Sequence, residues 1–149
     1  MMMLRNWDKH RDIGILLLRV GIGLMFVFHG WPKISGGVET WAKLGTAMQH
    51  LGLGFAPVFW GFMAAATEFF GGMLIAAGLL TRLAAMALTF NMFVAVVLKF
   101  STGAGLAGAS QALEVGFVFL SLIFIGAGRY SVDGYCQERH MPPLTRSVK

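Results

Sequence analysis

The sequence is poor in charged residues. Asp, Glu, Lys and Arg make up 13% of its 149 residues, whereas a soluble domain usually carries about 25%. Hydrophobic residues make up 56% of the chain, and the mean hydropathy is +0.69. A soluble enzyme is therefore excluded. The long apolar runs that take the place of charged residues predict an integral membrane protein, with the lipid bilayer as its first partner.

Cysteine and histidine are also scarce. Cys136 is the single cysteine, so an internal disulfide and an electron relay through cysteine pairs are excluded. Of the four histidines only His29 falls within an apolar run, so one chain cannot supply two axial histidines to a haem inside the membrane. No metal-ligand spacing and no phosphate-binding loop occurs. We therefore expect no haem, no other metal and no covalently bound cofactor.

The net charge of +5 does not indicate nucleic-acid binding. The basic residues lie mainly near the two ends of the chain and in one short turn, and no RNA- or DNA-binding pattern accompanies them. Membrane topology and contact with anionic lipid headgroups account for this distribution.

Four apolar runs predict an all-α fold, a bundle of four transmembrane helices, because about 20 apolar residues cross about 30 Å of hydrocarbon. Pro32 is expected to end the first run, and Thr81-Arg82 is expected to join the second and third as a helical hairpin. The third and fourth runs are shorter, and a buried or re-entrant helix is the alternative for each. The predicted spans are residues 13–31, 57–80, 83–98 and 111–127.

The spans lie in one predicted membrane domain, residues 13–133. Residues 1–12 are expected to form a cytoplasmic, interfacial segment, and residues 134–149 a polar cytoplasmic tail. Basic residues precede the first apolar run, as in a signal peptide, but no small-residue cleavage pattern follows it, so we expect this span to be retained. Residues 99–110 are rich in glycine and are predicted to be a loop.

The loop between the first two spans, residues 33–56, has one helical pattern. Residues 38–44 are compatible with a short amphipathic helix on the membrane surface. Trp41, Leu44 and Met48 would share its apolar face.

The orientation follows from counting basic residues outside the spans. One side holds three lysines, Lys33, Lys43 and Lys99, and the other holds eight basic residues. These eight are Arg5, Lys9, Arg11, Arg82, Arg129, Arg139, Arg146 and Lys149. Because basic residues are retained on the cytoplasmic side, both termini are predicted to be cytoplasmic.

Several polar residues fall within or beside the spans, where an ionisable group is costly and therefore a functional hypothesis. Glu68 lies mid-span among small residues, which indicates a tightly packed inner face. Asn91 is predicted to hydrogen-bond between helices. Arg129 and Asp133 form a candidate pair on the inner side. The candidate buried polar cluster comprises Arg19, His29, Lys33, Glu68, Gln111 and Glu114.

Two interpretations of this cluster stay open. Buried acids and bases could bind a polar headgroup, such as a quinone ring, and carry its protons. They could equally be a structural network of salt bridges that holds the helices together. The first interpretation describes a membrane component of a redox system, and the second a non-enzymatic scaffold or assembly partner. A small transporter is a third alternative, although no inverted repeat is visible.

Four segments together resemble the DoxX family of small bacterial membrane proteins. The first span carries Arg19-Val-Gly-Ile-Gly23, followed by His29-Gly30-x-x-Lys33. The second carries Glu68-Phe-Phe-Gly-Gly72 and ends in Thr81-Arg82. Glu114 stands at the family's acidic position in the fourth span, and the chain continues into Arg129-Tyr-Ser-Val-Asp133.

The resemblance implies a four-helix bundle in the bacterial inner membrane. Members are often described as oxidoreductase subunits, and relatives are associated with thiosulfate:quinone oxidase complexes, with resistance to oxidative stress and with quinone detoxification. A soluble or membrane redox protein and further copies of the chain are the partners we consider. Seven of the candidate residues stand at matching positions: Arg19, His29, Lys33, Glu68, Glu114, Arg129 and Asp133.

Overall fold

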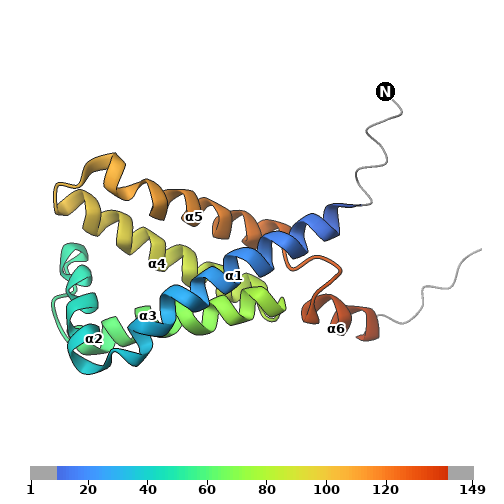
Figure 1. Cartoon of the computed structure of the whole chain (residues 1–149), viewed down its shortest axis with the longest axis horizontal. Helices are drawn as coiled ribbons and strands as arrows, with labels where there is room; N and C mark the ends of the chain where they lie inside the picture. The colour runs from blue at the N-terminus through green and yellow to red at the C-terminus, as the bar shows by residue number, and fades with distance from the viewer. Residues whose placement is uncertain (1–9, 141–149) are drawn as a thin grey trace, which may run out of the picture.

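The computed structural model describes residues 10–140, and these form helices joined by short connections, with no strand in that range. Four long helices run side by side (Figure 1). In chain order the elements are α1 (Arg11–Ser35), α2 (Gly37–Gly45), η3 (Thr46–Leu51), α3 (Pro57–Ala77), α4 (Thr81–Ser101), α5 (Gly105–Ile125) and α6 (Val132–His140). The predicted all-α bundle of four spans is confirmed, because α1, α3, α4 and α5 are each long and apolar enough to cross a membrane.

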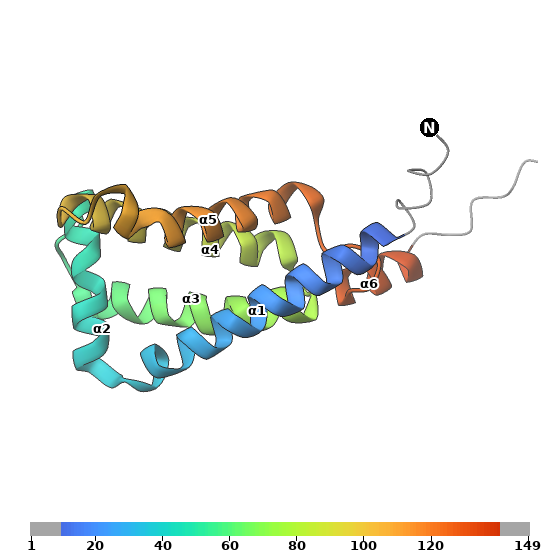
Figure 2. The same ribbon diagram turned by 45° about the horizontal axis from the view of Figure 1, so that its top comes forward.

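The two ends of the bundle differ. At one end, called here the terminal end, α1 begins, α3 turns into α4, and α6 lies beside the end of α5. At the other, called here the capped end, α2 and η3 run across the end of the bundle, transverse to the long helices (Figure 2). The chain therefore enters and leaves the bundle at the same end, as an even number of spans requires.

The prediction that Pro32 ends the first span is wrong, because α1 continues through it to Ser35. Proline lacks an N–H donor, but its fixed φ is compatible with a helix. Side chains satisfy carbonyl groups of this last turn: the Ser35 hydroxyl donates to the Trp31 carbonyl at 2.7 Å, and Trp41 Nε1 donates to the Lys33 carbonyl at 3.0 Å.

The other spans also differ from their predicted limits. α4 and α5 each contain 21 residues, so the predicted loop at 99–110 shrinks to residues 102–104. Its glycines suggested a loop, but glycine is common in membrane helices. α3 ends at Ala77, earlier than predicted, because Gly78 adopts a left-handed conformation with φ of 69° and turns the chain.

The predicted amphipathic helix is present as α2, and Met48, from the same predicted face, is buried in η3. α2 packs closely on the start of α3. A Cβ at Gly61 of α3 would lie 1.7 Å from the Trp41 carbonyl oxygen, and one at Gly45 would lie 1.7 Å from the Pro57 carbonyl oxygen. Glycine is therefore required at both crossings, and α2 forms part of the folded bundle.

The chain ends are described only in part. The expected polar tail, residues 134–149, begins inside α6, and its remainder from 141 lies outside the described residues. Residues 1–9 of the expected interfacial segment also lie outside them. Four of the basic residues used for the orientation fall there: Arg5, Lys9, Arg146 and Lys149.

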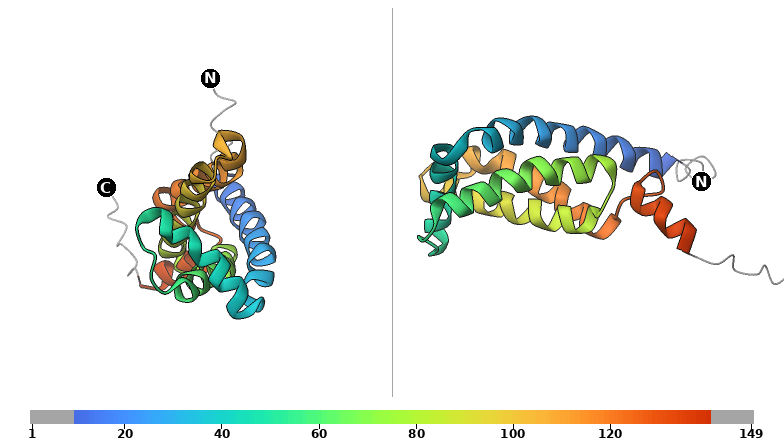
Figure 3. Two further views of the ribbon diagram at one scale, coloured as in Figure 1. Left: turned by 90° about the vertical axis from the view of Figure 1, so that its left-hand side faces the viewer. Right: turned by 90° about the horizontal axis from the view of Figure 1, so that it is seen from below.

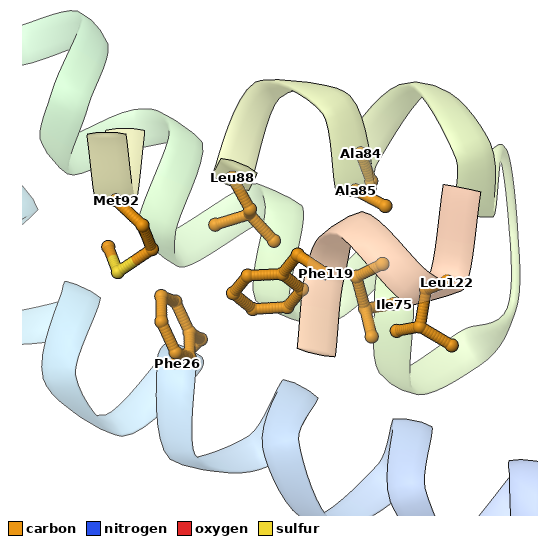
Figure 4. Close-up of a cluster of buried hydrophobic side chains, with 8 residues drawn as sticks. All are labelled: Phe26, Ile75, Ala84, Ala85, Leu88, Met92, Phe119 and Leu122. Carbon is orange, nitrogen blue, oxygen red and sulfur yellow. The ribbon is translucent and has the colours of Figure 1, made fainter. Parts of the chain in front are cut away.

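The core lies toward the terminal half of the bundle, where all four long helices contribute side chains (Figure 4). Phe26 of α1 meets Phe119 of α5 edge to face, with ring centroids 4.8 Å apart. Around them lie Ile75, Ala84, Ala85, Leu88, Met92 and Leu122. The opposite faces of the helices expose large apolar side chains, such as Phe28 and Phe124 at 72% and 77%. An apolar surface of this kind is suited to lipid.

Candidate functional site

A central cluster of three polar side chains joins α1, α3 and α4. Glu68, near the middle of α3, is only 7% exposed. Its Oε2 accepts an ion-paired hydrogen bond from Lys33 Nζ of α1. Its Oε1 accepts a hydrogen bond from Asn91 Nδ2 of α4 at 3.3 Å, and the same nitrogen lies 3.3 Å from the Ala64 carbonyl oxygen. Both carboxylate oxygens thus have partners, as a buried charge requires.

Close helix packing determines where the central cluster forms. A Cβ at Gly30 would lie 2.6 Å from the Phe69 backbone nitrogen, and one at Gly23 would lie 2.7 Å from the Gly72 carbonyl oxygen. These glycines let the backbones of α1 and α3 touch. Gly30 and Lys33 are three residues apart on one helical face. The close approach of α1 to α3 at Gly30 therefore brings the Lys33 side chain within reach of Glu68.

The two charged partners are not equally buried. The Glu68 side chain is 9% exposed, whereas that of Lys33 is 35% exposed. The ion pair therefore has one closed side, against α4, and one side that opens to the surroundings through Lys33. A polar group that approached from that side could contact the ammonium without disturbing the packing of α3.

A second, terminal cluster surrounds Arg19 of α1, which has no exposed surface. Its Nη1 donates to the Ile75 carbonyl oxygen of α3 at 3.0 Å, and its Nη2 donates to the Tyr130 carbonyl oxygen at 2.7 Å. The Asp133 carboxylate is close enough to attract the Arg19 charge. One guanidinium thus ties the first span to the second and to the segment that follows the fourth.

Asp133 holds the turn between α3 and α4. Its two carboxylate oxygens accept hydrogen bonds from the backbone N–H groups of Leu80 and Thr81 at 2.9 and 3.0 Å, and its own N–H donates to the Gly78 carbonyl oxygen at 2.9 Å. An acidic side chain at the start of a helix also interacts favourably with the helix dipole. Asp133, the last residue of the Arg129-Tyr-Ser-Val-Asp133 motif, therefore caps α4.

Glycine is required at position 78 for two reasons. Its φ of 69° is left-handed, and a Cβ there would lie 2.1 Å from Arg19 Nη1 and 2.5 Å from the Ser131 Cβ. The turn, the buried arginine and the capping segment therefore fit together only around a residue without a side chain.

The structure divides the cluster that the sequence predicted. Lys33 and Glu68 meet, together with Asn91, while Arg19 belongs to the terminal cluster. Gln111 and Glu114 are exposed and make no hydrogen bond to the central cluster within the described part of the chain. Glu114 lies five residues before the buried Phe119, which is about 140° around the helix. Its expected burial is therefore wrong.

His29 and Arg129 also lie at the surface. His29 is exposed beside the buried Gly30 and borders an apolar groove between α1 and α3, where Trp31 and Phe69 have ring centroids 5.6 Å apart. The Arg129 side chain is exposed, and its backbone N–H donates to Asp12 Oδ1 at 3.2 Å. Arg129 and Asp133, predicted as an inner-side pair, both lie at the terminal end, and the carboxylate of Asp133 accepts hydrogen bonds from the α4 backbone.

Asn91 takes a larger part than its sequence position indicated. Its amide is the third member of the central cluster, and the signal for it was a polar side chain in the middle of an apolar span. Within residues 10–140, no group of three His, Cys, Asp or Glu side chains is placed to hold a metal ion.

Comparison with known proteins places the chain in one family. The DoxX sequence model matches residues 14–101. "Inner membrane protein YqjF" of Escherichia coli is 30% identical over 128 residues, which cover 84% of this chain and 93% of that protein. "Putative oxidoreductase CatD" of Bacillus subtilis is 34% identical over 90 residues, or 60% of this chain and 62% of that protein. An uncharacterized protein of Haemophilus influenzae is 28% identical over 137 residues, which cover 87% of this chain and 96% of that protein. No solved structure matches significantly.

Proposed function

The chain belongs to the DoxX family of membrane proteins, and on that premise we propose that it is the membrane subunit of an oxidoreductase system and binds a quinone headgroup at the central cluster. The observation that carries this proposal is the one-sided ion pair, in which Glu68 is buried and Lys33 is 35% exposed. A relative that bears the name of an oxidoreductase adds support.

The chemistry of the pair suits a quinone. A quinone carbonyl oxygen is an acceptor, and the Lys33 ammonium is a donor on the open side of the cluster. Reduction of a quinone to a quinol takes up two electrons and two protons. A redox partner protein with its own cofactor would supply the electrons. Lys33 would donate its ammonium proton to one ring oxygen, and water on the open side would supply the proton for the other oxygen and restore the ammonium. The ionised Glu68 would position the ammonium.

The setting of the pair also suits an isoprenoid quinone. The groove beside His29 is lined by apolar side chains of α1 and α3 and faces outward from the bundle. A long apolar tail could lie there without crossing the packed interior. The bias of basic residues toward the terminal end supports a cytoplasmic location of both termini in the inner membrane, which is also part of the proposal.

Binding of a short-chain ubiquinone analogue to the purified protein tests the proposal. Glu68→Gln is expected to weaken the affinity about tenfold, because Lys33 loses the carboxylate that positions its ammonium, and a hydrogen bond from a charged donor contributes about 1.5 kcal/mol or more. His29→Ala is also expected to weaken binding. Glu39→Gln makes the same chemical change at an exposed position of α2, and its affinity should stay within about twofold of the unmodified protein.

The thermal midpoint of each variant, measured in the same detergent, separates lost binding from lost folding. If Glu68→Gln and His29→Ala both bind the quinone as tightly as the unmodified protein, the quinone proposal is rejected.

One observation favours a second candidate, a non-enzymatic scaffold. Both oxygens of Glu68 are satisfied by Lys33 and Asn91, so the cluster is complete as a structural lock between three helices. A scaffold should retain a partner at a fixed stoichiometry when the tagged chain is purified from native membranes. Glu68→Gln should then lower both thermal stability and partner retention, while Glu39→Gln leaves them unchanged. Purification of the chain alone would contradict this candidate.

A further inference from the structure

A groove of about 720 Å³ opens at the terminal end, far from the central cluster along the bundle. Its walls are the start of α4, the segment that follows α5, and α6, which lie next to one another at this end (Figure 3). The residues that matter for its chemistry are Leu80, Arg82, Leu83, Ile125, Arg129 and Asp133.

One part of the groove is basic. Arg82 and Arg129 both line it with exposed side chains. The Arg82 guanidinium lies along the segment after α5, since a Cβ at Gly126 would be 3.6 Å from its Nε and Nη2 atoms. No hydrogen bond or ion pair engages the Arg82 side chain among the residues that the structure describes. Its donors are therefore available to an anion.

The acidic residue in the groove does not cancel this charge locally. Asp133 directs both carboxylate oxygens at the backbone N–H groups of Leu80 and Thr81, and it also interacts with the buried Arg19 charge. Its charge is thus balanced within the terminal cluster. Asp133 therefore leaves the positive charge of Arg82 on the surface of the groove.

The other part of the groove is apolar. Leu80, Leu83 and Ile125 are 52%, 58% and 45% exposed. They stand at the ends of two membrane-spanning helices, so their side chains lie where a bilayer changes from headgroups to acyl chains. Positive charge and exposed apolar surface therefore adjoin in one groove, which matches the two parts of an anionic phospholipid.

We infer that this groove binds an anionic phospholipid, with the headgroup phosphate on Arg82 and Arg129 and the first part of an acyl chain on Leu80, Leu83 and Ile125. Arginine presents a planar set of donors that fits phosphate oxygens. Basic pockets between transmembrane helices are suited to such headgroups. The inference does not depend on quinone binding at the central cluster.

The test uses the full chain purified in a mild detergent and titrated with dioleoyl phosphatidylglycerol or dioleoyl phosphatidylcholine, with bound lipid counted by native mass spectrometry. The two lipids share their acyl chains and differ in headgroup charge. Phosphatidylglycerol should bind at least about fivefold more tightly. Arg82→Gln and Arg129→Gln should each weaken its binding about fivefold, while phosphatidylcholine binding changes little.

Arg11→Gln is the matched control, because Arg11 is an exposed arginine at the same end but not in the groove. It should leave both affinities unchanged. Equal binding of the two lipids, or an equal loss in Arg11→Gln and Arg82→Gln, would overturn the inference. Inorganic phosphate is expected not to displace phosphatidylglycerol at millimolar concentration. If it does, the groove recognises free phosphate, and the assignment to a lipid fails.

Discussion

Replacing Arg19 by methionine is expected to lower the free energy of unfolding by about 3–5 kcal/mol, which is the usual cost of removing one member of a buried charged pair. The substitution removes hydrogen bonds to the Ile75 and Tyr130 carbonyl oxygens and leaves Asp133 without its nearby countercharge. Methionine has a similar length, so the loss is mainly electrostatic. Reversible unfolding in mixed detergent micelles measures it.

Two further variants make the Arg19 prediction specific. Arg19→Lys keeps the charge but lacks the planar fork that reaches two carbonyl groups, so it should recover only part of the stability. Arg11→Met removes an exposed arginine from the same helix and should change stability by less than about 0.5 kcal/mol. If Arg19→Met were no more destabilising than Arg11→Met, the terminal cluster would not hold the bundle together.

Replacing Gly61 by alanine is expected to cost about 3 kcal/mol, at the upper end of ordinary overpacking. The added Cβ would lie 1.7 Å from the Trp41 carbonyl oxygen. This atom belongs to the backbone, so no side-chain rotation can relieve the clash and α2 must move away from α3. The hydrogen bond from Trp41 Nε1 to the Lys33 carbonyl is then at risk. The free energy of unfolding measures the cost.

Gly21→Ala is the control for this prediction. Gly21 lies within α1, and a Cβ there has no neighbouring atom within 4 Å. Alanine at an open helical position should be neutral or stabilise by up to about 1 kcal/mol. Similar effects of Gly61→Ala and Gly21→Ala would mean that α2 does not rest on α3 as described, and that the capped end is loosely attached.

The two clusters differ in how far the sequence could predict them. Arg19 and Glu68 are recognisable because a charge inside an apolar run must find a partner. Their partners were harder to predict. Arg19 pairs with backbone carbonyls and with Asp133, which is more than a hundred residues later in the chain, and such a pairing depends on how the helices are arranged. Glu68 meets Lys33 because glycines bring α1 and α3 together at that level.

The position of a residue along a span does not by itself predict whether its side chain is buried, as Glu114 shows. Its level along the fourth span was compatible with a cluster around Glu68, but burial depends on rotation about the helix axis. The α5 positions that face the core are Ala109, Phe119 and Leu122, and Glu114 points away from them. The apolar pattern of this helix is too uniform to predict its rotation, because both its core face and its lipid face are hydrophobic.

The class of protein, the number of spans and the residues whose burial needed an explanation could all be predicted from the sequence. These conclusions depend on the cost of moving polar groups into hydrocarbon, which each segment carries independently of the others. The packing of the helices was needed to show that the candidates form two separate clusters, that Asn91 completes one and that Asp133 caps α4 in the other. Those features depend on helix rotation and on backbone contact at glycines, which are properties of pairs of helices and not of any one segment.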